Sequence, residues 1–97
     1  MNKVYLITYN PDAVFNKTVF HSHVLSLYPK HISDWWHHID SAYLVVSTLN
    51  VNQLYNLVFP GVPGKYLLII EVDPNNAQGW LPNNAWSWLQ KYQRKIR

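Results

Sequence analysis

Residues 34–48 read DWWHHIDSAYLVVST, two β-rich runs that meet at Asp40 and Ser41. Short polar side chains such as these bond to nearby backbone and suit a tight connection, so the stretch predicts a β-hairpin. Because side chains alternate along a strand, each run presents two faces. The expected faces are Trp35, His37 and Ile39 on one side, with Trp36 and His38 on the other. Both faces therefore carry large side chains.

The segment before the hairpin predicts one strand and one helix. The strand, residues 4–10, is apolar on both faces, with Tyr5, Ile7 and Tyr9 on one of them. The helix, residues 13–28, follows a turn and ends before Pro29, which cannot continue a helix. Its apolar positions recur at helical spacing. They are Phe15, Val19, Phe20, Val24 and Leu27.

The segment after the hairpin predicts a short helix, a strand and a last helix. Asn50 and Gln53 have the spacing of a capping box, and the short helix ends before the rigid loop 60–64. Residues 65–72 are apolar at both parities, which is typical of a central or covered strand. Asn83 or Asn84 can cap the last helix. Its apolar stripe is Ala85, Trp88, Leu89, Tyr92 and Ile96, with Trp88 expected as the anchor.

This order of elements predicts an α+β fold of the ferredoxin-like βαββαβ type, with a four-stranded antiparallel sheet, two helices on one face and an added C-terminal helix. Residues 1–97 are expected to form a single domain. The expected core includes Leu6, Phe20, Val24, Leu44, Val46, Leu54 and Leu68. The second sheet face is too apolar to face water, so either the C-terminal helix or a second subunit should cover it. We therefore expect a homodimer formed through the sheet face or its edge.

Composition restricts the class of protein. Apolar residues make up 48% of the chain and charged residues 13%, which is typical of a globular core and not of a disordered chain. The sequence has no cysteine, which excludes disulfides and thiolate metal sites. No apolar run approaches the roughly 20 residues of a membrane span, and the first residues do not resemble a signal peptide. These features predict a soluble, cytoplasmic protein with no membrane partner.

The net charge of +3 comes from the C-terminal end. Before residue 91 the chain has four lysines and five acidic residues. The basic residues of the tail are Lys91, Arg94, Lys95 and Arg97. They are candidate nucleic-acid contacts, although a nearly neutral body disfavours a wide phosphate-binding surface. The simpler interpretation is a solvated helix end whose cations suit the helix dipole, and in that case the charged end is not part of the fold.

Three segments together resemble small bacterial and phage proteins described as SinR-like. They are residues 5–9, residues 35–46 and residues 79–89, so the resemblance covers nearly the whole chain. Those proteins resemble distant members of the ferredoxin-like superfamily that includes the smaller CRISPR spacer-integration protein and the virulence-associated protein D ribonucleases. The resemblance implies a ferredoxin-like scaffold, with metal-dependent ribonuclease activity as one alternative.

In that superfamily, an aspartate at the end of the first strand is the residue usually held responsible for nuclease activity. This chain has Asn10 at that position, and an amide lacks the negative charge that holds Mg²⁺ or Mn²⁺. Asp12 lies two residues on and could substitute, although turn chemistry explains an aspartate there equally well. Asn10 and Asp12 are therefore the catalytic candidates, and no cofactor is expected unless the nuclease alternative holds.

The five histidines do not predict a metal site. His21 and His23 lie about 200° apart around a helix, and His37 and His38 point to opposite sides of a strand. Zinc requires three or four converging ligands, and Glu71 is the only glutamate. We expect the histidines to be polar edges of aromatic surfaces.

The tyrosines raise a different alternative. Tyr5, Tyr9 and Tyr43 on a four-stranded sheet would match the platform on which RNA-recognition motifs stack bases. Burial at a protein interface explains the same residues better, because tyrosine is enriched there. The preferred function is a noncatalytic interaction or regulatory protein on a dimeric scaffold. The alternatives are a weak metal-dependent endoribonuclease and a single-stranded nucleic-acid binder.

Overall fold

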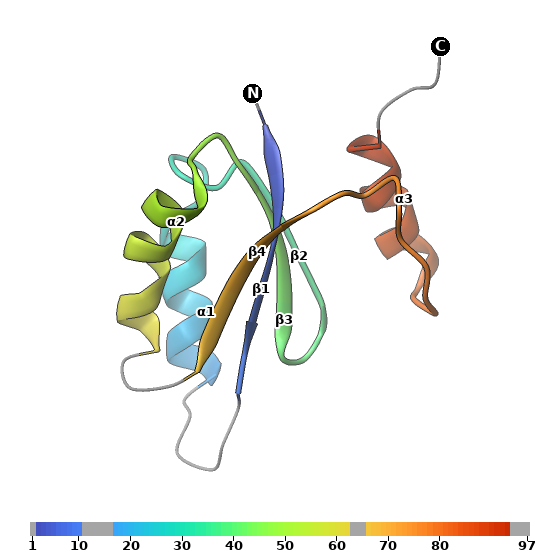
Figure 1. The fold of residues 1–97 in the computed structure, drawn as a ribbon. Helices are drawn as coiled ribbons and strands as arrows, with labels where there is room; N and C mark the ends of the chain where they lie inside the picture. Colours follow the sequence, from blue (N-terminus) through green and yellow to red (C-terminus); the bar gives the residue numbers. More distant parts are fainter. Residues whose placement is uncertain (1, 11–16, 63–65, 94–97) are drawn as a thin grey trace.

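The computed structural model describes residues 2–10, 17–62 and 66–93, which form an α+β fold (Figure 1). Its strands are β1 (Lys3–Tyr9), β2 (Asp34–Ile39), β3 (Ala42–Ser47) and β4 (Leu67–Val72). Its helices are α1 (Lys17–Ser26), α2 (Val51–Val58) and α3 (Asn83–Lys91), with a short 3₁₀ turn at Phe59–Gly61. None of the helices in these ranges is long and apolar enough to cross a membrane.

The four strands form one antiparallel sheet in the order β2-β3-β1-β4, so the fold is ferredoxin-like, as predicted. Helices α1 and α2 pack on one face of the sheet, and α3 lies on the opposite side (Figure 1). We call the α1 and α2 side the helix face and the other side the open face. The C-terminal helix therefore covers part of the second face, which is one of the two alternatives that the sequence predicted.

The hairpin of β2 and β3 turns at Asp40 and Ser41, as predicted. Its register contains a bulge, because Trp36 pairs with Leu44 while Ile39 pairs with Ala42. One extra residue in β2 reverses the alternation beyond it. Ile39 therefore lies on the same face as Trp36, and its expected placement beside Trp35 and His37 is wrong.

The main core lies between the sheet and the helix face. Phe20 and Val24 of α1 and Leu54 and Val58 of α2 are buried there. The capping box at Asn50 is confirmed, with both reciprocal hydrogen bonds to Gln53 present. Side chains of β1 and β3 complete the core from the sheet side. They are Tyr5, Ile7, Tyr9, Tyr43 and Val45.

Two of the predicted strand and core positions need correction. Residues 67–72 form an edge strand and not a central one, because β4 pairs only with β1 in the sheet. Leu68, expected in the core, is 54% exposed, because it lies on the open face beyond the reach of α3. Leu6 and Leu44 lie on the same face and are half-buried, whereas Val46 is fully buried as expected.

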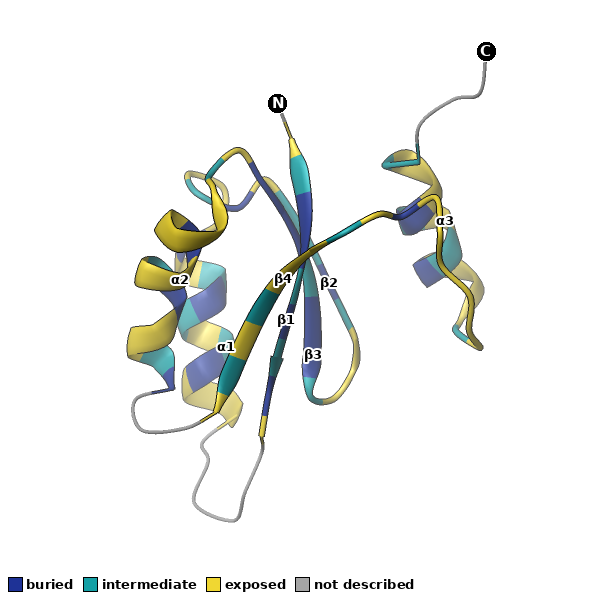
Figure 2. Ribbon diagram, viewed as in Figure 1, coloured by how far each residue is buried: buried dark blue, intermediate teal, exposed yellow. Residues whose placement is uncertain are grey.

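Helix α3 buries Ala85 and Leu89, two members of the predicted stripe (Figure 2). Trp88, the expected anchor, is only half-buried, and so is Trp86. The helical angle explains this, because the two tryptophans flank the direction of Ala85 and Leu89 on opposite sides. Leu89 is therefore the most deeply buried large side chain of the helix, and Ile96 lies outside the described residues.

Candidate functional site

The open face is the candidate functional site, and strand pairing determines which side chains form it. Val4, Leu6 and Thr8 of β1 pair with Val46, Leu44 and Ala42 of β3 and with Val72, Ile70 and Leu68 of β4. Directly paired residues in an antiparallel sheet point to the same side. Because Tyr5, Ile7 and Tyr9 belong to the core under α1 and α2, their neighbours form the open face. It is almost entirely apolar.

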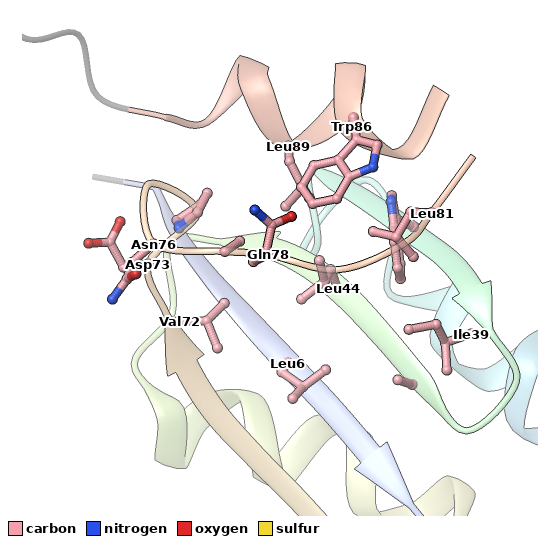
Figure 3. Close-up of a pocket in the computed structure, with 14 residues that line it drawn as sticks. Leu6, Ile39, Leu44, Val72, Asp73, Asn76, Gln78, Leu81, Trp86 and Leu89 are labelled. Carbon is pink, nitrogen blue, oxygen red and sulfur yellow. The ribbon is translucent and has the colours of Figure 1, made fainter. Parts of the chain in front are cut away.

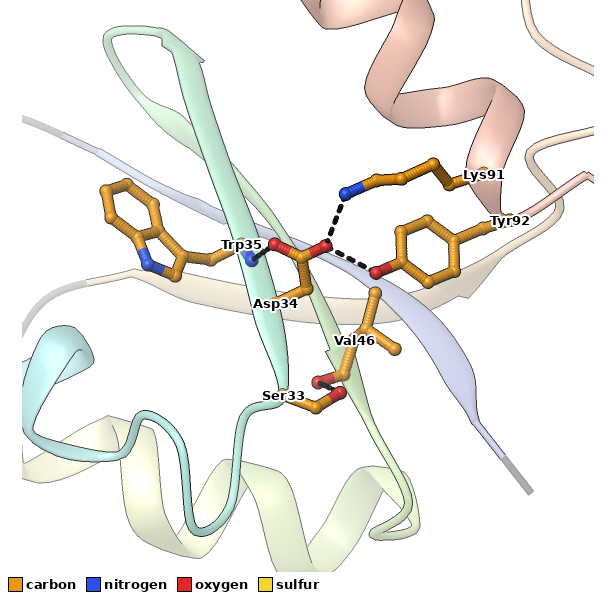
Figure 4. Close-up of polar contacts among 6 residues, drawn as sticks. All are labelled: Ser33, Asp34, Trp35, Val46, Lys91 and Tyr92. Carbon is orange, nitrogen blue, oxygen red and sulfur yellow. Dashed lines mark hydrogen bonds and ion pairs between the residues drawn. The ribbon is translucent and has the colours of Figure 1, made fainter.

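A polar cluster attaches α3 to the open face (Figure 4). The carboxylate of Asp34, at the start of β2, accepts hydrogen bonds from the Tyr92 hydroxyl, from Lys91 Nζ at 3.1 Å and from the backbone N–H of Trp35 at 2.9 Å. Lys91, expected to belong to a solvated tail, is thus part of this contact. Arg94, Lys95 and Arg97 lie outside the described residues.

The environment of Asp34 favours its charged form. Partial burial on its own would raise the pKa of the Asp34 carboxyl, but the interactions with Tyr92, Trp88 and Lys91 and the Trp35 N–H together hold that pKa below its usual value. Burial and the adjacent carboxylate raise the pKa of the Tyr92 hydroxyl, so it stays protonated and donates. The contact between α3 and β2 is therefore strongest when Asp34 is ionised.

Replacing Asp34 with asparagine should weaken this attachment. We expect a loss of about 1–2 kcal/mol in the free energy of unfolding at pH 7, because a charge-assisted acceptor is replaced by a neutral one. The folded-state pKa of Asp34 lies below its unfolded value, so the wild-type advantage is complete above about pH 4 and disappears as the pH falls through the folded-state pKa.

Urea unfolding at pH 7 and at successively lower pH measures this difference, and the gap between the two proteins should narrow as the pH falls below about 4. Asp40→Asn is the matched control, because Asp40 is exposed and its ion pair with Lys17 is exposed as well. Its replacement should change stability little. An equal effect of both substitutions at pH 7 would contradict the role of Asp34.

A cavity of about 430 Å³ lies between the open face and α3 (Figure 3). The sheet contributes apolar side chains, among them Leu6, Leu44 and Val72, and α3 contributes Trp86 and Leu89. The segment that connects β4 to α3 forms the remaining wall, with Gln78 and Leu81. Helix α3 thus covers the open face without filling the space beneath it.

The part of the open face beyond α3 is exposed. Leu68 is 54% and Ile70 47% accessible on the edge strand β4, and Tyr66, which directly precedes this strand, is 83% accessible. In the segment between β4 and α3, Trp80 is 96% accessible. We call the three residues along β4, which are Tyr66, Leu68 and Ile70, the apolar patch. Their placement could not be read from sequence, because every one of them resembled a core residue.

The three tyrosines predicted as a stacking platform lie on the helix face instead. Tyr5, Tyr9 and Tyr43 are buried beneath α1 and α2 and so cannot stack on a bound base in this structure. Their hydroxyls are used internally: that of Tyr5 donates to the Leu49 carbonyl at 2.7 Å, and that of Tyr9 donates to the Asp40 carbonyl at 2.6 Å. Burial raises the pKa of both hydroxyls, with further contributions from Glu71 and Asp40 respectively.

His21 and His37 both contact Tyr43, and their rings lie 5.8 Å apart between centroids, whereas His23 and His38 have other partners. His21 Nδ1 lies 2.6 Å from the Tyr43 hydroxyl, whereas His23 Nε2 donates to the Leu57 carbonyl at 2.7 Å and connects α1 to α2. His37 stacks on the Tyr43 ring at 3.9 Å between centroids, while His38 packs against Trp36 on the open face. Within ranges 2–10, 17–62 and 66–93, no three His, Asp or Glu side chains converge as metal ligands.

Of the two catalytic candidates, Asn10 lies at the edge of the apolar patch, next to Tyr66 and Leu68. Asn10 follows β1, where its backbone N–H donates to the Tyr66 carbonyl at 3.4 Å. Together with Thr8 and Tyr66 it lines a shallow pocket at the end of the sheet. Asp12 lies outside the described residues. Asn10 thus directly follows β1, and the catalytic role that the resemblance implies for it stays a prediction.

Comparison with models of protein families, with curated proteins and with solved structures finds no match to this chain. The resemblance to SinR-like proteins therefore stays a prediction.

Proposed function

We propose that this chain is a noncatalytic interaction or regulatory protein that acts as a homodimer on its ferredoxin-like scaffold. The observation that supports this proposal is the apolar patch of Tyr66, Leu68 and Ile70 along β4, on the side of the sheet opposite α1 and α2. Contiguous apolar surface that is not covered within a chain marks sites of protein association. The second copy lies against the open face alongside β4.

The position of the patch supports association further. Strand β4 is at the edge of the sheet, and an edge strand has backbone groups free to pair with another chain unless something covers it. Leu68 and Ile70 are two residues apart and point the same way, toward the open face. A partner that covers them would extend the apolar layer already formed by Leu6 and Leu44.

Replacing Ile70 with lysine should convert the dimer into a monomer. Ile70 is half-exposed, so a lysine there can keep its charge in water in the monomer but would bury it in the dimer. Light scattering at tens of micromolar protein measures the mass, and circular dichroism checks that the fold is retained.

The matched control is Val19→Lys, which places the same charge at an exposed apolar residue of α1, on the other side of the sheet. It should leave the dimer intact. A wild-type protein that has the mass of a monomer throughout this concentration range would overturn the proposal.

Metal-dependent ribonuclease activity remains the alternative implied by the resemblance, with Asn10 and Asp12 as its candidate residues. It is tested by incubating the pure protein with RNA, with and without Mg²⁺ or Mn²⁺. Metal-dependent cleavage that Asp12→Ala abolishes would replace the proposal of a noncatalytic protein. Cleavage that survives Asp12→Ala would instead indicate contamination or a different site.

A further inference from the structure

The side chain of Trp80 extends into solvent. It lies in the segment between β4 and α3, and 96% of its surface is accessible, so it makes almost no contact within the chain. Tryptophan is the side chain with the largest apolar area, and its exposure to water is unfavourable. In contrast, Trp36 is buried, and Trp86 and Trp88 are each half-buried against the sheet.

The cavity beneath α3 lies next to this projecting residue. Leu81, which directly follows Trp80, and Gln78, two residues before it, both line the cavity, and Figure 3 shows them between α3 and the sheet. Its volume of about 430 Å³ falls within the size range of roughly 300–1,000 Å³ in which proteins hold small molecules. The cavity can therefore accommodate one indole ring, and its walls are mainly apolar.

We propose that Trp80 of each copy inserts into the cavity beneath α3 of a second copy. This inference rests on the proposed homodimer and specifies its central contact. A two-fold dimer uses the same surface on both copies, so a projecting residue beside a cavity can form two identical insertions. The projection and the cavity belong to the same region of one chain, which favours a second copy over a different partner.

The available area is consistent with a stable dimer. Aromatic side chains bury roughly 150–250 Å² each, so the inserted Trp80 alone supplies roughly a quarter of the ~800 Å² per partner that stable interfaces bury. Leu68, Ile70 and the half-exposed Ile39 extend the apolar surface toward the remainder. Large aromatic residues at the centre of an interface commonly supply most of its binding energy.

Two variants test the insertion. One removes the inserted ring, and the other blocks the cavity that would accept it. Trp80→Ala removes the projecting ring and keeps the cavity. Ala77→Phe keeps Trp80 but places a ring in the cavity from an exposed residue that lines it, so the fold should tolerate the change. Each variant alone is expected to dimerise at least roughly 100-fold more weakly than wild type, because both insertions are lost.

Mixing the two variants is the decisive measurement. Trp80 of the Ala77→Phe protein can enter the open cavity of the Trp80→Ala protein, so a mixture should form a heterodimer that neither variant forms as a homodimer. Sedimentation of the separate and mixed proteins detects it. Tyr55→Ala, which removes an exposed aromatic ring from α2, is the control and should leave the dimer unchanged.

The outcomes separate this inference from the proposal on which it rests. If wild type is a dimer and Trp80→Ala dimerises equally well, or if the mixture forms no heterodimer, the insertion is overturned while the homodimer stands. If wild type is monomeric at every concentration, both are overturned.

Discussion

Replacing Phe20 with alanine is expected to lower the free energy of unfolding by roughly 3–5 kcal/mol, a large fraction of the stability of a domain of this size. Phe20 is completely buried, and its ring lies 4.8 Å from that of Tyr9 and 5.6 Å from that of Tyr43, between centroids. Truncation would leave a cavity among side chains of α1, β1 and β3. The melting temperature should fall by about 4–8 °C for each kcal/mol lost.

Thermal and urea unfolding of the two proteins measure this effect. Val19→Ala is the control, because Val19 precedes Phe20 on the same helix but is 56% exposed. It should shift the melting temperature by much less. If both substitutions lowered the free energy of unfolding equally, this would contradict the burial of Phe20 between α1 and the sheet.

Replacing Leu89 with alanine is expected to cost roughly 2–3 kcal/mol, toward the lower end of the range for a buried leucine. The lower value is expected because Leu89 borders the existing cavity and already lacks some contacts. Apart from Ala85, it is the only residue of α3 that is fully buried. Its truncation should therefore loosen α3 from the sheet while the main core stays folded.

Hydrogen exchange distinguishes local loosening from a general loss of stability. Amides of α3 should exchange faster in Leu89→Ala, while those of α1 and β3 remain protected under the same conditions. Gln90→Ala changes an exposed neighbour on the same helix and serves as the control. Unchanged protection of α3 in Leu89→Ala would contradict the role of Leu89 in attaching this helix to the sheet.

Local signals in the sequence predicted the elements and their order correctly. The turn at Asp40 and Ser41 and the capping box at Asn50 depend on residues close together in the chain, so they could be read directly. The bulge in β2 could not, because nothing in the run from Trp36 to Ile39 shows that one residue goes unpaired. That single residue moved Ile39 to the other face.

The sequence also did not predict which face of the sheet packs against the helices. β1 and β4 are apolar at both parities, so alternation alone could not decide which side lies under α1 and α2. If α1 and α2 packed on the other face, the side chains of Tyr5, Tyr9 and Tyr43 would be exposed and available for stacking. If the helices packed on the same face as these tyrosines, the tyrosines would be buried. The structure buries them, which removes the basis for a base-stacking platform.

The sequence by itself determined a ferredoxin-like order of strands and helices, because hydrophobic periodicity and turn chemistry act over short distances. Only the tertiary structure decided that Leu68 and Ile70 of β4 are exposed, that α3 leaves a cavity over the open face, and that Trp80 is exposed. An apolar residue looks the same in sequence whether it packs within its chain or faces solvent. Its exposure depends on where segments distant in sequence meet, and the candidate interaction surface is made of residues that no such segment covers.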